Sequence, residues 1–177
     1  MRPVPVDHVT VEPGNTGVLV GGTVPFTAKA FDASNNQLSG LAGNDTLIGG
    51  AGRDTVDGGV GNDFIVMQVT TGDVDVAHGG TGNDTLVLSG VVPLTGVVVA
   101  DLSVADQVVS IGGMTDALVQ DGFENLDASG LGSSVNATGS TGANIIIGSN
   151  GADIINGGAG NDVLNGGAGG DMMIGGL

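Results

Sequence analysis

A nine-residue pattern, G-G-x-G-x-D-x-U-x with U a large aliphatic residue, recurs along this chain and limits its possible folds more than any other feature. Clean copies are residues 49–57, 58–66, 79–87, 157–165 and 166–174. Weaker copies are residues 40–48, 70–78, 139–147 and 148–156, and residues 130–138 keep the phase without the acid. One such unit cannot bury its own apolar face, so the pattern predicts a stack of repeats.

The sixth position of the repeat is acidic in most copies. These acids are Asp45, Asp54, Asp63, Asp75, Asp84, Asp153, Asp162 and Asp171. They are nine residues apart within each of two arrays, except for a three-residue insertion between Asp63 and Asp84. Val135 and Asn144 stand at this position where the acid is missing.

Each repeat predicts one turn followed by one short strand. The six residues G-G-x-G-x-D suit a turn, because glycine accepts positive φ and lets main-chain carbonyls point at a shared centre. The last three residues suit a strand whose central side chain points inward. The inward residues are Leu47, Val56, Ile65, Leu86, Ile146, Ile155, Leu164 and Met173. The sequence therefore predicts an all-β solenoid, a flattened right-handed parallel coil with an apolar ladder inside.

Two repeats complete one turn of such a coil, so residues 18 apart lie side by side. Asp45 then lies near Asp63, and Asp153 lies near Asp171. Allowing for the insertion, Asp54 faces Asp75 and Asp63 faces Asp84. Paired carboxylates repel one another, and a hard cation that takes 6–8 oxygens at about 2.3–2.6 Å relieves this repulsion.

Calcium suits these turns better than magnesium, which demands stricter geometry and keeps its waters. The predicted calcium ligands are the eight aspartates and oxygens of the turn glycines Gly43, Gly50, Gly52, Gly59, Gly61, Gly80, Gly82, Gly151, Gly158, Gly160, Gly167 and Gly169. The alternative is a metal-free solenoid whose aspartates only cap turns, which fits best at Asn144 and Val135.

Composition narrows the class further. The formal net charge is -16, from 19 acidic and 3 basic residues, which excludes binding to nucleic acid phosphates through charge. The chain has no Cys, so it has no disulfide and no thiolate metal site. No stretch is long and apolar enough for a transmembrane helix.

No catalytic motif accompanies the repeats. The two histidines, His8 and His78, are not in an H-E-x-x-H motif, and no serine lies in G-x-S-x-G. We therefore expect a non-catalytic protein. An ice-binding solenoid is disfavoured, because the seventh position lacks a regular outward threonine array.

The motifs in residues 40–87 and 130–177 resemble the hemolysin-type calcium-binding repeats of RTX proteins. Residues 121–130, DGFENLDASG, resemble the spacer that often precedes such arrays. The resemblance implies a calcium-loaded parallel β-roll, export by the type I secretion machinery, and folding on arrival in calcium-rich surroundings. It also implies an uncleaved C-terminal export signal. Because the chain stops at the start of another repeat without such a signal, we expect a fragment of a longer protein.

Residues 6–40 resemble the first half of a bacterial Ig-like domain of surface adhesins. The expected organisation is a partial Ig-like β segment at 1–40, a first array at 41–87, a β-rich spacer at 88–129 and a second array at 130–177. The combined expectation is a calcium-binding module of a secreted, extracellular or cell-surface, adhesin-like protein with an unidentified surface ligand. The alternative is the non-catalytic tail of a secreted protease, lipase or polysaccharide-modifying enzyme.

Overall fold

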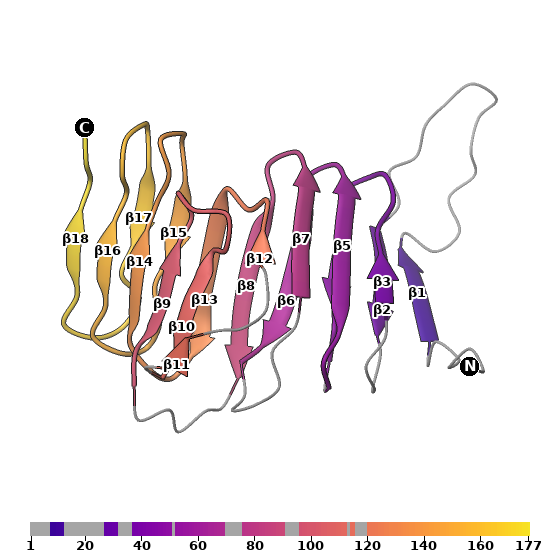
Figure 1. Cartoon of the computed structure of the whole chain (residues 1–177), viewed down its shortest axis with the longest axis horizontal. Coiled ribbons are helices and arrows are strands. Elements are labelled where there is room, and N and C mark those ends of the chain that lie inside the picture. The colour runs from indigo at the N-terminus through magenta and orange to yellow at the C-terminus, as the bar shows by residue number, and fades with distance from the viewer. Residues whose placement is uncertain are drawn as a thin grey trace.

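The chain winds as a β-solenoid in which consecutive repeats stack on one another (Figure 1). The computed structural model describes residues 8–12, 27–31, 37–50, 52–69, 76–90, 96–112, 114–115 and 120–177. These ranges contain strands and turns and no α-helix. The described residues therefore include no helix that could span a membrane. The predicted all-β fold of stacked repeats is confirmed. Asp75 and most of the segment expected to resemble an Ig-like domain lie outside the described residues.

One side of the solenoid is an eight-stranded sheet in the order β1-β2-β4-β6-β8-β13-β15-β17. Its strands are β1 (His8–Glu12), β2 (Thr27–Phe31), β4 (Thr46–Ile48), β6 (Phe64–Gln68), β8 (Thr85–Gly90), β13 (Asn125–Leu131), β15 (Ile145–Ile147) and β17 (Val163–Asn165). All neighbours are parallel except β1 and β2. Because β2 pairs in parallel with β4, the two N-terminal strands extend the sheet of the repeats.

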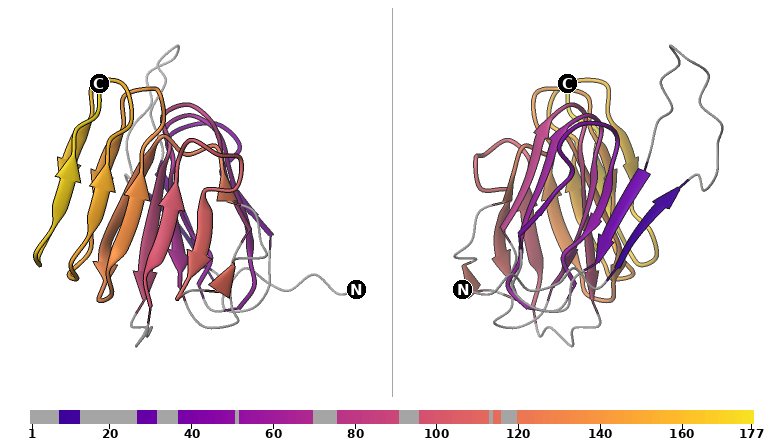
Figure 2. Two further views of the ribbon diagram at one scale, coloured as in Figure 1. Left: turned by 60° about the vertical axis from the view of Figure 1, so that its left-hand side comes forward. Right: turned by 90° about the vertical axis from the view of Figure 1, so that its right-hand side faces the viewer.

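The opposite side is formed by two shorter sheets. One contains β3 (Gln37–Ser39), β5 (Thr55–Val60), β7 (Val76–Thr81) and β12 (Gln120–Asp121). The other contains β9 (Val98–Asp101), β10 (Val108–Ile111), β11 (Met114–Thr115), β14 (Val135–Thr138), β16 (Ile154–Asn156) and β18 (Met172–Ile174). The two sides face each other across a narrow interior (Figure 2).

Strand register agrees with two repeats per turn of the coil. Leu47 pairs with Ile65 and Ile146 pairs with Leu164, so residues 18 apart lie on neighbouring strands. The three-residue insertion is absorbed between strands, because Ile65 pairs with Leu86 in the same way.

The eighth position of most repeats contributes a side chain to the core. The inward side chains Leu47, Val56, Ile65, Leu86, Ile146 and Ile155 are at most 1% exposed. Burying one such aliphatic side chain contributes about 1.5–3 kcal/mol. At the C-terminal end, Leu164 and Met173 keep the register of the ladder, but Leu164 is only partly buried and Met173 is 51% exposed. These two residues belong to β17 and β18, the outermost strands of their sheets, so no further described strand covers them.

The region between the arrays is part of the solenoid where it is described. β10 forms antiparallel pairs with β9 and β11, then β12 adds to β7 and β13 adds to β8. β13 pairs in parallel with both β8 and β15, so it joins the two arrays in one sheet. The expected acid-free repeat at 130–138 is present as β14, which lies between β9 and β16.

Candidate metal centre

The two glycines that bend each turn have left-handed main-chain conformations. In the repeat at 58–66, φ is +98° at Gly59 and +137° at Gly61. φ is also positive at the second and fourth positions of the other clean repeats, and residues with a Cβ rarely adopt such values. In the weaker repeats at 139–147 and 148–156, the fourth-position glycines Gly142 and Gly151 do not have a φ in this region.

The glycine that opens each repeat has no positive φ and is required for another reason. A Cβ on Gly40 would lie 2.5 Å from the carbonyl oxygen of Gly58 and 2.7 Å from Oδ2 of Asp45. A Cβ on Gly157 would likewise lie 2.5 Å from Oδ2 of Asp162 and 2.7 Å from the carbonyl oxygen of Gly175. The missing side chain leaves room for two oxygens, which we call the turn oxygen pair.

A turn oxygen pair consists of Oδ2 of the sixth-position acid and the carbonyl oxygen of the glycine that opens the stacked repeat. The opening glycines Gly58 and Gly148 have the same two kinds of oxygen beside them. The sequence predicted carbonyl ligands from second- and fourth-position glycines and did not include the first-position carbonyls that lie beside these acids. The doubled glycine at the start of each repeat could have indicated these carbonyls. Only the second glycine needs a positive φ, so the first must be glycine for another reason, namely space.

The sixth-position acids form a hydrogen-bonded ladder along the turns. The main-chain N–H of Asp45 donates to Oδ1 of Asp63 at 2.8 Å, and the N–H of Asp63 donates to Oδ1 of Asp84 at 2.8 Å. The N–H of Asp153 donates to Oδ1 of Asp171 at 3.0 Å. These contacts join the pairs that the 18-residue spacing and the insertion predict.

The second oxygen of these acids is left without a protein partner. Oδ2 has no hydrogen bond and is inaccessible to solvent in Asp45, Asp63, Asp84 and Asp162. A buried polar atom without a partner costs about 1–3 kcal/mol, and more when the group is charged. Each of these unpartnered oxygens is therefore a candidate cation ligand.

Electrostatics disfavour the charged form of the central acids when no cation is present. Burial raises the pKa of Asp63 above its usual value, and the nearby carboxylates of Asp45 and Asp57 raise it further. Burial also raises the pKa of Asp84, with added repulsion from Asp63 and Glu124. The hydrogen bond from the neighbouring main-chain N–H opposes these effects in both residues.

Asp153 lies in a turn of a different kind. Its Oδ2 accepts the N–H of Ser149 at 2.6 Å, while Oδ1 accepts the Ser149 hydroxyl at 2.7 Å and the N–H of Val135 at 2.7 Å. Asn144 makes similar contacts, because its Oδ1 accepts the N–H of Ser140 at 2.7 Å. Serine at the second position of the repeat thus satisfies these side chains without a cation.

Asp54 is 2% exposed, and its expected partner Asp75 lies outside the described residues. Within the described ranges, no group of three or more His, Cys, Asp or Glu side chains is arranged to hold a metal ion. A cation at the turns must therefore take much of its coordination from main-chain carbonyls. Carboxylate and carbonyl oxygens are the donors that calcium prefers.

Comparison with known families agrees with this geometry. A family model described as the RTX calcium-binding nonapeptide repeat, in four copies, matches residues 32–65, 69–90 and 138–173, more than half of the chain. The chain belongs to the RTX calcium-binding nonapeptide repeat family. RTX repeats bind calcium, and stacked in this solenoid they form a calcium-binding β-roll module. Searches of curated proteins and of solved structures found no significant match.

Proposed function

We propose that the turn oxygen pairs whose Oδ2 has no protein partner bind calcium, and that the ions couple folding of the β-roll to the surrounding calcium concentration. The observation that carries this proposal is the row of buried, unpartnered Oδ2 atoms, each beside a glycine carbonyl oxygen. The acids assigned to this role by their buried, unpartnered Oδ2 are Asp45, Asp63, Asp84 and Asp162. Asp171 is added because its Oδ2 lies beside the opening glycine Gly166. Asp54 and Asp75 are assigned by their sequence positions alone, and Asp153 acts mainly as a turn anchor.

The mechanism follows from charge and chain entropy. The chain has a formal net charge of -16 and 36 glycines, so repulsion and flexible turns both oppose folding without cations. Each bound ion stabilises the folded state by about 2.7 kcal/mol at a hundredfold excess over its dissociation constant. Several such sites in one stack make folding steep in calcium concentration.

This behaviour fits a module of a secreted or cell-surface protein. Extracellular calcium modules commonly bind at about 10⁻⁴–10⁻³ M, which lies above cytosolic calcium levels. Inside the cell the chain would then be unfolded and could be exported by type I secretion machinery, and outside the cell it would fold. The Ig-like resemblance of residues 6–40 favours an adhesin-like parent protein, in which this module has a non-catalytic role.

Isothermal titration with calcium, and separately with magnesium, tests the binding proposal. We expect several calcium ions per chain and little heat from magnesium at the same concentration. Limited proteolysis well below and well above about 10⁻³ M free calcium tests the coupling. Protection only in high calcium supports the proposed function, and equal protection in both conditions contradicts it.

A further inference from the structure

We propose that the short turn at 122–124, outside the matched repeats, forms an additional calcium site together with Asp84. The proposal rests on the proposed function, since it extends the same chemistry to a turn that lacks the G-G-x-G-x-D pattern. The family match ends at residue 90 and resumes at residue 138, so it assigns nothing to this turn.

Strand register stacks the turn at 122–124 directly on the turn at 79–84. Asp121 pairs with His78 on one side of the solenoid, and Asn125 pairs with Thr85 on the other. Three residues therefore cover the same path as six residues of the clean repeat. A sequence search for the nine-residue period cannot find a turn shortened in this way.

The shortened turn supplies the same main-chain oxygen as a clean repeat. The carbonyl oxygen of Gly122 is the atom nearest to a Cβ built on Gly79, with the side chain of Asp84 close by. The carbonyl oxygen of Gly79 has the corresponding place beside Gly58. Gly122 itself has a φ of +73°, which favours glycine at this bend.

Glu124 continues the ladder of acids. The N–H of Asp84 donates to Oε2 of Glu124 at 2.8 Å, as the N–H of Asp63 donates to Asp84 at 2.8 Å. The extra methylene of glutamate extends the carboxylate from the shortened turn to the position that an aspartate reaches from a full turn. Asp84 and Glu124 together bring two carboxylates to one place.

A second observation points to a ligand at this place. Asp84 is 0% exposed, and its Oδ2 has no hydrogen-bond partner. A buried carboxylate oxygen beside a second carboxylate and a glycine carbonyl is an unfavourable arrangement unless a cation neutralises it. Only oxygen donors are present among these groups, so the chemistry selects a hard divalent cation such as calcium.

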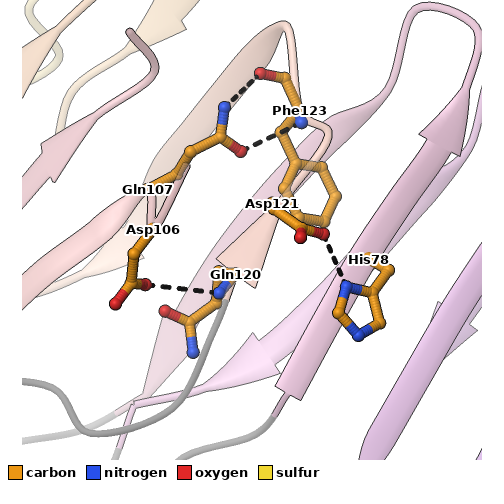
Figure 3. Close-up of polar contacts among 6 residues, drawn as sticks. All are labelled: His78, Asp106, Gln107, Gln120, Asp121 and Phe123. Atoms are coloured by element: carbon orange, nitrogen blue, oxygen red, sulfur yellow. Dashed lines mark hydrogen bonds and ion pairs between the residues drawn. The ribbon is translucent and has the colours of Figure 1, made fainter. Parts of the chain in front are cut away.

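Gln107 holds the shortened turn in place, as Figure 3 shows. Its Oε1 accepts the N–H of Phe123 at 2.9 Å, and its Nε2 donates to the carbonyl oxygen of Phe123 at 2.8 Å. Gln107 and Phe123 are 5% and 2% exposed, so these bonds are shielded from water. We assign Gln107 as a positioning residue that presets the turn, with no direct contact to the ion.

The test is to count calcium ions per chain by equilibrium dialysis for wild type and Glu124→Gln. Glutamine keeps an oxygen that accepts the N–H of Asp84 but removes the charge, so we expect one fewer ion, or at least a tenfold loss of affinity for one ion. The matched control is Asp127→Asn, which removes one charge from β13, the strand that follows Glu124, while keeping an acceptor for the N–H of Ser129. The control should bind as many ions as wild type.

Unchanged stoichiometry and affinity in Glu124→Gln, with a wild type that binds calcium, would overturn this site and leave the proposed function intact. A wild type that binds no calcium would overturn both. If Glu124→Gln does not reach the wild-type circular dichroism spectrum in excess calcium, Glu124→Asp is the second variant. Aspartate keeps the negative charge, but its shorter side chain moves the carboxylate away from Asp84. Weaker binding of one ion by Glu124→Asp supports the site, and unchanged binding overturns it.

Discussion

At the scale of single residues, the two glycines that open a repeat serve different physical purposes. Gly59 provides a positive φ, whereas Gly58 provides space for Oδ2 of Asp63 and the carbonyl oxygen of Gly79. The two carboxylate oxygens of the acid also have different roles. Oδ1 accepts a main-chain N–H from the neighbouring turn, and Oδ2 is available to a cation. The sequence predicted the acids from their period. It could not predict which carbonyls face them, because that depends on the path of the stacked turn.

Gly58→Ala tests the need for space at the opening position. The added methyl group would collide with the stacked carbonyl, so we expect a loss of about 1–3 kcal/mol in the free energy of unfolding. The measurement is urea unfolding in saturating calcium, followed by circular dichroism. Gly132→Ala is the control, because nothing lies within 4 Å of its Cβ position, and it should change stability by less than about 0.5 kcal/mol. Equal effects at the two positions would refute the steric argument.

Asp63→Asn and Asp153→Ala separate a calcium ligand from a turn anchor. Asp63→Asn should lower the number of calcium ions bound, because Oδ2 of Asp63 has no other partner. Asp153→Ala leaves the N–H groups of Val135 and Ser149 without an acceptor, which lowers the free energy of unfolding by about 1–3 kcal/mol. It should therefore shift folding to higher calcium without changing the number of ions. Calcium counting by equilibrium dialysis, combined with a folding titration, distinguishes the two results. The same loss of ions in both variants would contradict the assignment.

At the scale of elements, the phase of the repeat predicts which strand residues face inward better than hydrophobicity does. β15 consists of three isoleucines, yet Ile146 is 0% exposed while Ile145 is 48% exposed. Apolarity alone cannot distinguish them, whereas the eighth position of the repeat identifies Ile146. The phase is lost between the arrays, where the shortened turn at 122–124 and its Gln107 contacts could not be predicted because they depend on a pairing distant in sequence.

Ile146→Ala and Ile145→Ala test this distinction on neighbouring residues of one type. Ile146→Ala leaves a cavity in the core, so we expect a loss of about 2–5 kcal/mol in the free energy of unfolding. Ile145→Ala removes half-exposed side-chain surface, and the loss should be less than about 1 kcal/mol. Urea unfolding in saturating calcium measures both. A larger effect at Ile145 would mean that the strand is turned the other way.

At the scale of the whole molecule, the two arrays are joined along one edge of the solenoid. The ladder on this edge consists of Asp45, Asp63, Asp84, Glu124, Asn144 and Asp162. β13 provides the matching connection through the sheet, because it pairs with both β8 and β15. The sequence indicated two arrays with a spacer, since the acid period breaks there. Their physical continuity makes one cooperative folding transition the expected behaviour.

Far-ultraviolet circular dichroism during a calcium titration, with magnesium as the control, tests the central claim most directly. The account predicts one transition from coil to β-structure, steeper than binding to a single site, with calcium and not with magnesium. The chain has no Trp or Tyr, so circular dichroism reports this change better than intrinsic fluorescence. A spectrum that is already rich in β-structure in chelator, and unchanged by calcium, would contradict calcium-coupled folding and indicate a metal-independent solenoid.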